Sequence, residues 1–205
     1  MGGIRVPVIA ITGGIASGKS AFTGRLARRL SAEVFDADAS ARELVENDPE
    51  TRQRLLSGFG SQIVGDDGRV DRVRLRETVF GDATRRKLLE EILHPKIRAQ
   101  WTGQARKARQ KGDWFLVEIP LLFETGAESE CDAVVVVACQ RATQKARIVS
   151  QRGLPEEMAE KMIASQASLT SKVLKGNYMI WNDAPMARME EQVELFAGYL
   201  GKRYG

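Results

Sequence analysis

The feature that most constrains this chain is a glycine-rich segment at residues 13–20, with the sequence Gly-Gly-Ile-Ala-Ser-Gly-Lys-Ser. An apolar run, Val6–Thr12, precedes it, and a helical pattern from about Lys19 to Leu30 follows. Glycines let consecutive backbone N–H groups turn toward one anion at the positive end of a helix dipole. Lys19 adds a charge for the β- and γ-phosphates, and Ser20 offers a hydroxyl to Mg²⁺. The pattern in this context predicts a nucleotide-binding phosphate loop.

The rest of the chain alternates strand-like runs with helical patterns, which is typical of a parallel α/β sheet. Two of the runs are almost continuously apolar, as expected for strands that are covered on both faces. Five strands are predicted in all: Val6–Thr12, Glu33–Phe35, Trp114–Ile119, Ala133–Ala138 and Asn177–Trp181.

A long helical stretch lies between the second and third predicted strands. Asp71 is a good N-cap for a helix ending near Phe80, and Asp82 for another running to Leu93. Pro95 suits the first turn of a third helix, which ends near Lys111. So much helix in one crossover predicts a subregion that projects from the sheet. A second insertion, Arg141 to about Lys175, is also helical and basic.

Composition limits the class of protein and its partners. The 205 residues carry a net charge of +4 and contain no apolar run near the roughly 20 residues that cross a bilayer. The N-terminal residues resemble a first core strand more than a signal peptide, so a cytoplasmic protein without a membrane partner is expected. Cys131 and Cys139 are expected to be free thiols. The basic residues are dispersed, which favours phosphorylated metabolites over nucleic acid.

Carboxylates follow two of the predicted strands, at the sheet edge where α/β proteins bind ligands. Asp36-Ala37-Asp38 comes directly after the second strand. Asp38 can accept a proton from an attacking hydroxyl or help to hold Mg²⁺, but it can equally cap a helix that begins near Ala39.

Two further polar residues carry open alternatives. Glu118 ends the third strand and can orient Mg²⁺ through a water, or it can be a solvated strand end. His94, the only histidine, is either structural or catalytic, and the structural role is the commoner one for a lone histidine.

Beyond the phosphate loop, several segments resemble the dephospho-CoA kinase family. They occur in the family's order and span nearly the whole chain: residues 11–20, Phe35-Asp36-Ala37-Asp38, Asp67-Gly68-Arg69-Val70-Asp71-Arg72, Leu93-His94-Pro95-Lys96-Ile97, Glu118-Ile119-Pro120-Leu121-Leu122-Phe123-Glu124, Ala164-Ser165-Gln166 and Ile180-Trp181-Asn182. The phosphate loop is shared by many families, whereas the Asp-Ala-Asp, His-Pro and Pro-Leu-Leu-Phe-Glu elements in this order are far more specific.

The resemblance implies a three-layer P-loop fold with a five-stranded parallel sheet and two helical insertions. Residues 1–38, 112–140 and 176–205 would form the nucleotide-binding core. Residues 39–111 would be a helical region for the CoA substrate, and residues 141–175 a lid. The implied activity is ATP-dependent transfer of the γ-phosphoryl group to the ribose 3′-hydroxyl of dephospho-CoA, the last step of coenzyme A synthesis. A monomer or weak homo-oligomer is expected, with Mg²⁺ as cofactor and ATP as co-substrate.

The resemblance also implies a role for each site residue. Asp38 would be the catalytic base, assisted by Lys19 and Arg147. ATP would contact Gly14, Ile15, Ala16, Ser17, Gly18, Lys19, Ser20, Ala21, Arg141 and Asn182. The acceptor would contact Asp38, His94, Glu118, Leu121, Phe123 and Glu124. Mg²⁺ would bind Ser20 directly and Glu118 through water.

The chain departs from the family pattern at three places. Glu118 stands where the family commonly has Asp, and Ala16 stands where Gly is usual. In the lid, four residues instead of three separate Arg147 from the next arginine, so that Gln151 takes the expected arginine position and Arg152 lies one residue later. The sequence therefore leaves open which lid arginine contacts the phosphates.

Other functions compatible with the phosphate loop are a kinase for another small acceptor and a nucleotide-dependent switch. The switch has less support, because the sequence contains no Asn-Lys-x-Asp motif for reading guanine. A basic nucleic-acid-binding protein is a third possibility, but no recognised nucleic-acid-binding motif supports it.

Overall fold

A computed structural model describes residues 6–204 of the chain, apart from the Met186 side chain. These residues fold as two compact units. The first comprises the residues up to Asp36 together with those from Gly103 onward, and the second comprises Ala37–Thr102. Within the described part of the chain, no helix is both long enough and apolar enough to span a bilayer.

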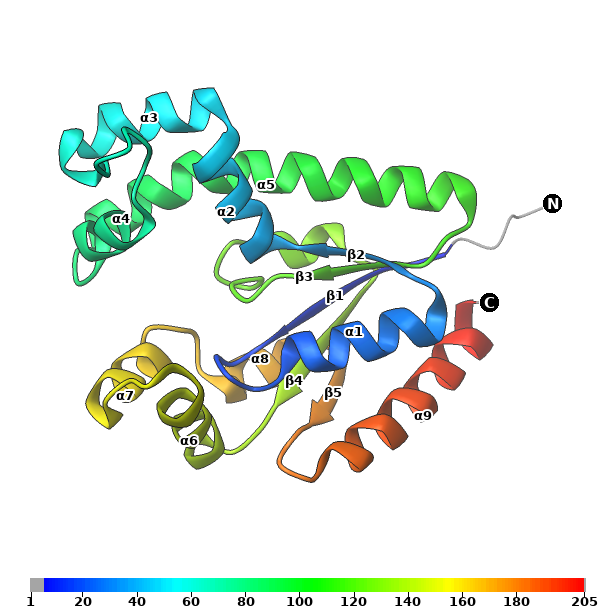
Figure 1. The fold of residues 1–205 in the computed structure, drawn as a ribbon. Coiled ribbons are helices and arrows are strands. Elements are labelled where there is room, and N and C mark those ends of the chain that lie inside the picture. The colour runs from blue at the N-terminus through cyan, green and yellow to red at the C-terminus, as the bar shows by residue number, and fades with distance from the viewer. Residues whose placement is uncertain (1–5, 205) are drawn as a thin grey trace. The chain divides into compact units, whose positions relative to one another are not determined.

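The first unit contains the predicted five-stranded parallel sheet, in the order β2-β3-β1-β4-β5 (Figure 1). Its central strand, β1, pairs with β3 on one side and β4 on the other. Each strand lies within two residues of its predicted bounds: β1 Val8–Gly13, β2 Glu33–Asp36, β3 Phe115–Glu118, β4 Ala133–Ala138 and β5 Tyr178–Trp181. The predicted α/β fold class is confirmed.

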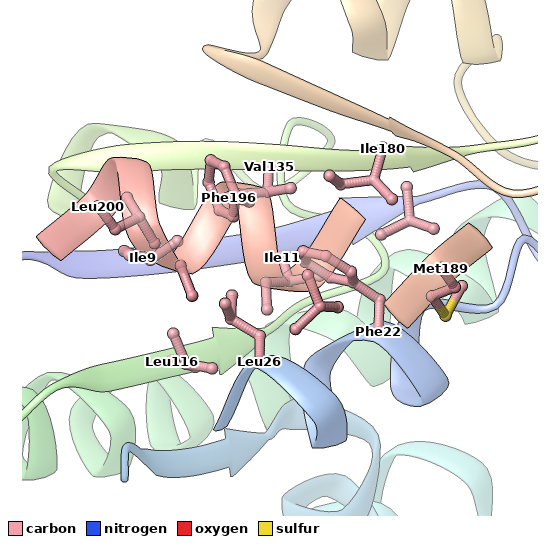
Figure 2. Packing of buried hydrophobic residues seen from close by; sticks show 13 residues of the cluster. Ile9, Ile11, Phe22, Leu26, Leu116, Val135, Ile180, Met189, Phe196 and Leu200 are labelled. Atoms are coloured by element: carbon pink, nitrogen blue, oxygen red, sulfur yellow. The ribbon is translucent and has the colours of Figure 1, made fainter. Parts of the chain in front are cut away.

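Two helices cover one face of this sheet, α1 (Lys19–Leu30) and α9 (Met186–Tyr204), and they pack against each other. Figure 2 shows their apolar side chains meeting those of the strands. Phe22 and Leu26 of α1 and Leu200 of α9 are completely buried against Ile9 and Ile11 of β1. Burial of each such side chain contributes about 1.5–3 kcal/mol. This core anchors the segment between β1 and α1, where the phosphate loop lies.

The basic insertion after β4 forms three helices of the first unit, α6 (Arg141–Arg152), α7 (Glu156–Ala164) and α8 (Leu169–Lys175). Helices α6 and α7 pack together, while α8 lies against β4 (Figure 1). A short 3₁₀ helix, Ala127–Glu130, precedes β4.

The second unit is helical and has its own core. It contains α2 (Ala37–Asn47), α3 (Pro49–Phe59), a 3₁₀ turn (Ser61–Ile63), α4 (Arg72–Val79) and most of α5 (Ala83–Lys111). Leu55 and Ile63 are fully buried at its centre. As predicted, Asp71 caps α4, accepting the N–H groups of Val73 and Arg74 at 2.7 and 3.1 Å.

The prediction of separate helices on the two sides of Pro95 is wrong, since α5 is continuous from Ala83 to Lys111. Proline has no N–H, so the carbonyl of Glu91, four residues earlier, loses its helical donor. The Arg54 guanidinium approaches that carbonyl at 3.5 Å and provides a replacement. The predicted role of Asp82 at the helix start is confirmed, because its carboxylate accepts the N–H groups of Thr84 and Arg85 at 2.9 and 3.0 Å.

Candidate active site

The phosphate loop turns sharply between β1 and α1. Gly13 has a φ of 150°, and a β-carbon there would lie 2.1 Å from the Val137 carbonyl oxygen. Gly18, just before α1, has a φ of 93°, and a β-carbon there would lie 2.1 Å from the Asn182 side-chain nitrogen. Gly13 therefore requires glycine for both conformation and space, and Gly18 requires it for conformation.

Ala16, the departure from the glycine-rich pattern, adopts the left-handed conformation with a φ of 55°. An L-residue with a β-carbon pays about 1–2 kcal/mol for this conformation. The loop thus keeps a backbone geometry that suits glycine, although it lacks glycine at this point.

Two side chains inside the loop indicate a binding site for an anion. Lys19 is buried, and its ammonium donates to the Gly14 carbonyl at 3.0 Å, which holds the charge at the loop. The Ser17 hydroxyl is completely buried and has no hydrogen-bond partner among the described residues. A buried hydroxyl without a partner is costly, so this atom is a good candidate for contact with a ligand or an ordered water.

The loop meets the end of β3 through a hydrogen bond from Ser20 Oγ to Glu118 Oε1, 2.7 Å long. Glu118 is only 7% exposed, so it is not a solvated strand end. Its register partners are Ile11 on β1 and Asp36 on β2. One hydroxyl and one carboxylate fit Mg²⁺, which prefers oxygen ligands and usually binds one or two carboxylates together with waters and substrate phosphates.

Arg147 on α6 lies against the phosphate loop. Its guanidinium donates to the carbonyls of Ala16, Ser17 and Asn182 at 3.2, 3.3 and 2.9 Å. The amide of Asn182 donates to the same Ser17 carbonyl at 2.8 Å. The structure therefore brings together three predicted nucleotide-site elements that are far apart in sequence: the loop, the α6 arginine and the residue that follows β5.

Arg141, at the start of the same helix, forms an ion pair with Glu160 on α7 instead. Gln151 and Arg152, at the other end of α6, are exposed. Among the α6 arginines Arg141, Arg147 and Arg152, Arg147 is the one that donates hydrogen bonds to the phosphate loop.

Two glutamines that sequence reasoning gave no role also hold the phosphate loop. The Gln144 amide donates to the Ile15 carbonyl at 2.7 Å, and Gln166 Oε1 accepts the Ile15 N–H at 3.0 Å. Gln166 belongs to the Ala-Ser-Gln element of the family resemblance. That element was the one sequence signal that could have identified this residue as part of the site. Ala21, the last predicted loop residue, is partly buried in the first turn of α1 and packs on the core.

The segment after β3 is fixed by a buried lysine that the sequence did not single out. Lys172 of α8 is fully buried, and its ammonium contacts the Pro120 carbonyl at 2.8 Å and the Glu124 carboxylate at 3.0 Å. Burial raises the pKa of Glu124, but hydrogen bonds from the Ala167 N–H and from Lys172 outweigh it, so this pKa lies below its ordinary value. Lys172 thus orders the segment that contains predicted acceptor residues.

Leu121 and Phe123, in the same segment, are half-buried. The Lys175 ammonium lies 5.7 Å from the centroid of the Phe123 ring, within the range of a cation–π contact.

Asp38 and His94, the other predicted acceptor residues, belong to the helical unit. Helix α2 begins at Ala37, so Asp38 lies inside its first turn and is not the N-cap of a helix beginning near Ala39. A carboxylate in this position interacts favourably with the helix dipole. His94 lies half-buried in α5, where burial and the nearby Arg98 lower its pKa despite the opposing effect of Glu90. The lowered pKa favours the neutral imidazole.

Comparison with known proteins identifies the relatives of this chain. The family model for dephospho-CoA kinase matches residues 7–188. A dephospho-CoA kinase from Symbiobacterium thermophilum is 39% identical, with 91% of this chain and 78% of the relative covered. A dephospho-CoA kinase from Bacillus cereus is 37% identical, with 92% and 94% covered.

Solved structures give a matching result. The crystal structure of TT1252 from Thermus thermophilus superposes with a TM-score of 0.79 at 30% identity, covering 96% of this chain and 98% of that one. Dephospho-CoA kinase from Campylobacter jejuni follows with a TM-score of 0.64 at 26% identity, covering 94% and 96%. Shikimate kinase from Acinetobacter baumannii, at 12% identity and a TM-score of 0.56, shares the fold over 98% of this chain and 96% of its own.

Proposed function

The chain belongs to the dephospho-CoA kinase family, and we propose that it transfers the γ-phosphoryl group of ATP to the ribose 3′-hydroxyl of dephospho-CoA, giving CoA and ADP. This reaction is the final step of coenzyme A synthesis. The observation that carries the phosphoryl-transfer chemistry is the phosphate loop joined to the end of β3 by the Ser20–Glu118 hydrogen bond.

Catalysis of such a transfer rests on positioning and on neutralising charge, because the transition state is loose. The N–H groups of the loop would cradle the β- and γ-phosphates of ATP, with Lys19 adding a positive charge. Arg147 would support this site from the lid, since its guanidinium already contacts the loop carbonyls. Ser20 directly, and Glu118 through a water, would hold Mg²⁺, which when bound neutralises charge on the transferred group.

Asp38 would orient the 3′-hydroxyl of the acceptor and accept its proton as the bond to phosphorus forms. The family match at Asp-Ala-Asp and the place of Asp38 two residues after β2 in the chain support this role. His94, Leu121, Phe123 and Glu124 would line or support the acceptor site. Residues 39–111 would bind the rest of the CoA substrate, and residues 141–175 would act as the lid.

The working form in this proposal is a cytoplasmic monomer or weak homo-oligomer whose partners are the free metabolites. The dispersed basic residues support small phosphorylated partners, since no dense cationic block favours a polyanion.

Replacement of Asp38 by Asn tests the assigned base. The amide keeps the size of the side chain but cannot accept the proton, so kcat should fall by about 10²–10⁴-fold while the KM for ATP changes little. Asp36→Asn is the matched control, because it removes the neighbouring carboxylate of the same motif and should lower kcat much less. Near-normal turnover by Asp38→Asn would remove Asp38 as the base.

A further inference from the structure

The helical unit contains a cavity of about 300 Å³ between α2, α4 and the first half of α5. Its floor is apolar and is formed by buried side chains of the unit's core, among them Val45, Leu75, Val79 and Leu93. Its size lies at the lower end of the range for small-molecule sites. Four arginines also line it: Arg42, Arg72, Arg76 and Arg86. We refer to it as the arginine cavity.

All the charged side chains that line the arginine cavity are positive. Arg72 is paired with Glu46 at 2.9 Å, but the guanidinium groups of Arg42, Arg76 and Arg86 form no hydrogen bond or ion pair with any residue the structure describes. The described lining includes no aspartate or glutamate. Three unpaired cations beside an apolar floor favour a ligand that combines a strong anion with an apolar portion.

Three other cations of the same unit, none of which lines the cavity, have acidic partners. Arg74 contacts Asp66 at 3.2 Å, Arg85 contacts Asp82 at 3.4 Å, and Lys96 contacts Asp48 at 2.5 Å. If the three unpaired cavity arginines were ordinary surface residues, we would expect some of them to have acidic partners as these three cations do. The contrast therefore marks the arginine cavity as the place in this unit that is best suited to an external anion.

The arginine cavity lies along the same face of α2 as Asp38. Asp38, Ala41, Arg42 and Val45 are spaced at i, i+3, i+4 and i+7, and the last three line the cavity. At 1.5 Å per residue, Arg42 is about 6 Å along the helix axis from Asp38. A ligand whose reacting hydroxyl is at Asp38 can thus extend into the cavity without leaving the unit.

We propose that the arginine cavity binds the diphosphate and pantetheine arm of the acceptor, an inference that rests on the proposed function. In dephospho-CoA the diphosphate is attached to the 5′ carbon of the same ribose whose 3′-hydroxyl reacts. Arg42, Arg76 and Arg86 bind the two phosphates, and the apolar floor receives the branched carbon segment of the arm. Phe80, which is 56% exposed, adds an apolar edge to the cavity.

A second cavity in this unit, of about 590 Å³, fits the same ligand less well. Its lining includes the carboxylates of Glu46 and Asp48, which repel phosphate. Its Arg52 guanidinium already donates to the Gly68 carbonyl. Volume alone therefore does not decide between the two cavities, whereas charge favours the arginine cavity.

The test uses the full-length enzyme and the variants Arg42→Gln, Arg76→Gln and Arg86→Gln, with Lys87→Gln as control. Lys87 is adjacent to Arg86, carries the same charge and does not line the cavity. Steady-state kinetics would give the KM for dephospho-CoA and for ATP, and titration calorimetry would give the Kd for dephospho-CoA and for adenosine, which lacks the diphosphate and the arm. Circular dichroism melts would verify folding.

Each cavity variant should raise the KM and Kd for dephospho-CoA roughly tenfold, because it removes a charged hydrogen bond to the ligand; a factor of ten corresponds to about 1.4 kcal/mol. The KM for ATP and the Kd for adenosine should stay within about twofold of those of Lys87→Gln. Cavity variants that match Lys87→Gln in their KM for dephospho-CoA would overturn this inference and leave the proposed function standing. Absence of dephospho-CoA turnover by the unmodified enzyme would instead overturn the proposed function, and this inference with it.

Discussion

The Ser20 hydroxyl donates a 2.7 Å hydrogen bond to the carboxylate of Glu118, a residue 98 positions later in the chain. This bond joins the first turn of α1 to the carboxyl end of β3. It brings the phosphate loop and the one buried acid at the end of β3 to the same point, where oxygen ligands for Mg²⁺ are needed.

Glu118→Gln should lower kcat/KM by about 10–100-fold, the range typical of outer-shell metal partners. The amide oxygen can still accept the Ser20 hydrogen bond, but the negative charge is lost. The concentration of Mg²⁺ giving half-maximal rate should therefore rise, as measured by titrating Mg²⁺ at fixed ATP. Glu118→Asp is the control, because it restores the acid that the family commonly has and should retain most of the activity. An unchanged Mg²⁺ requirement in Glu118→Gln would contradict the assignment.

Arg147→Gln should raise the KM for ATP more than Arg141→Gln does. Arg147 contacts the carbonyls of Ala16 and Ser17, whereas Arg141 is paired with Glu160. We expect at least a tenfold difference between the two variants, since hydrogen bonds from a charged group contribute on the order of 1.5–3 kcal/mol. Steady-state kinetics at saturating dephospho-CoA would measure it. A larger effect of Arg141→Gln would mean that the other lid arginine serves the nucleotide.

Gly13→Ala should destabilise the protein by at least about 2 kcal/mol, because the new methyl group would meet the Val137 carbonyl in a conformation that disfavours alanine. Gly24→Ala is the matched control within α1, where the nearest atom to a β-carbon, on Arg28, is 3.8 Å away. That change should stabilise the protein by about 0.5–1 kcal/mol. Urea unfolding followed by circular dichroism would measure both free energies. Equal effects of the two changes would refute the steric account of Gly13.

Asp48 caps the N-terminus of α3, and its carboxylate makes the free energy of unfolding depend on pH in the acid range. Hydrogen bonds from the Lys96 ammonium and then from the Thr51 hydroxyl and N–H lower the pKa of Asp48 from 3.8 to about 2. Since the folded pKa is the lower one, this contribution to stability is complete above the unfolded value and is lost as the pH falls through the folded value. Stability should thus decline from about pH 4 to about pH 2.

Asp48→Asn should remove that part of the decline, which urea unfolding at several pH values would show as a shallower slope. Asp113→Asn is the control, because the Asp113 side chain is exposed and makes no hydrogen bond or ion pair within the described part of the chain. A wild-type slope in Asp48→Asn would show that other carboxylates govern acid stability.

Features coded by short segments were predictable from the sequence. The phosphate loop, the five strands and the caps at Asp71 and Asp82 each depend on a few neighbouring residues, and the structure contains all of them. The separate helices around Pro95 were predicted wrongly for the same reason. A local rule ends a helix there, whereas the carbonyl freed by the proline is reached by Arg54, 37 residues from Glu91 in the chain.

Contacts between distant segments were not predictable. Gln144 and Gln166 hold Ile15 across 129 and 151 residues. Gln144 lies in α6 and Gln166 follows the end of α7, and no local pattern assigns either side chain to the phosphate loop. In the sequence, Lys172 resembles an ordinary surface lysine of a basic helix. In the structure it is buried and contacts the Pro120 carbonyl. The sequence also left open which lid arginine lies at the phosphate loop. In the structure Arg147 contacts the loop, through a hydrogen bond to the Ala16 carbonyl.

The most direct test of the central claim is ADP release from Mg-ATP in the presence of dephospho-CoA, compared with no acceptor and with AMP. The account predicts turnover only with dephospho-CoA, and a product that carries its new phosphate on the 3′-hydroxyl. ADP release with AMP and none with dephospho-CoA would contradict it and indicate a kinase for another acceptor. Nucleotide binding without turnover of any acceptor would contradict it as well, and would favour a nucleotide-dependent switch.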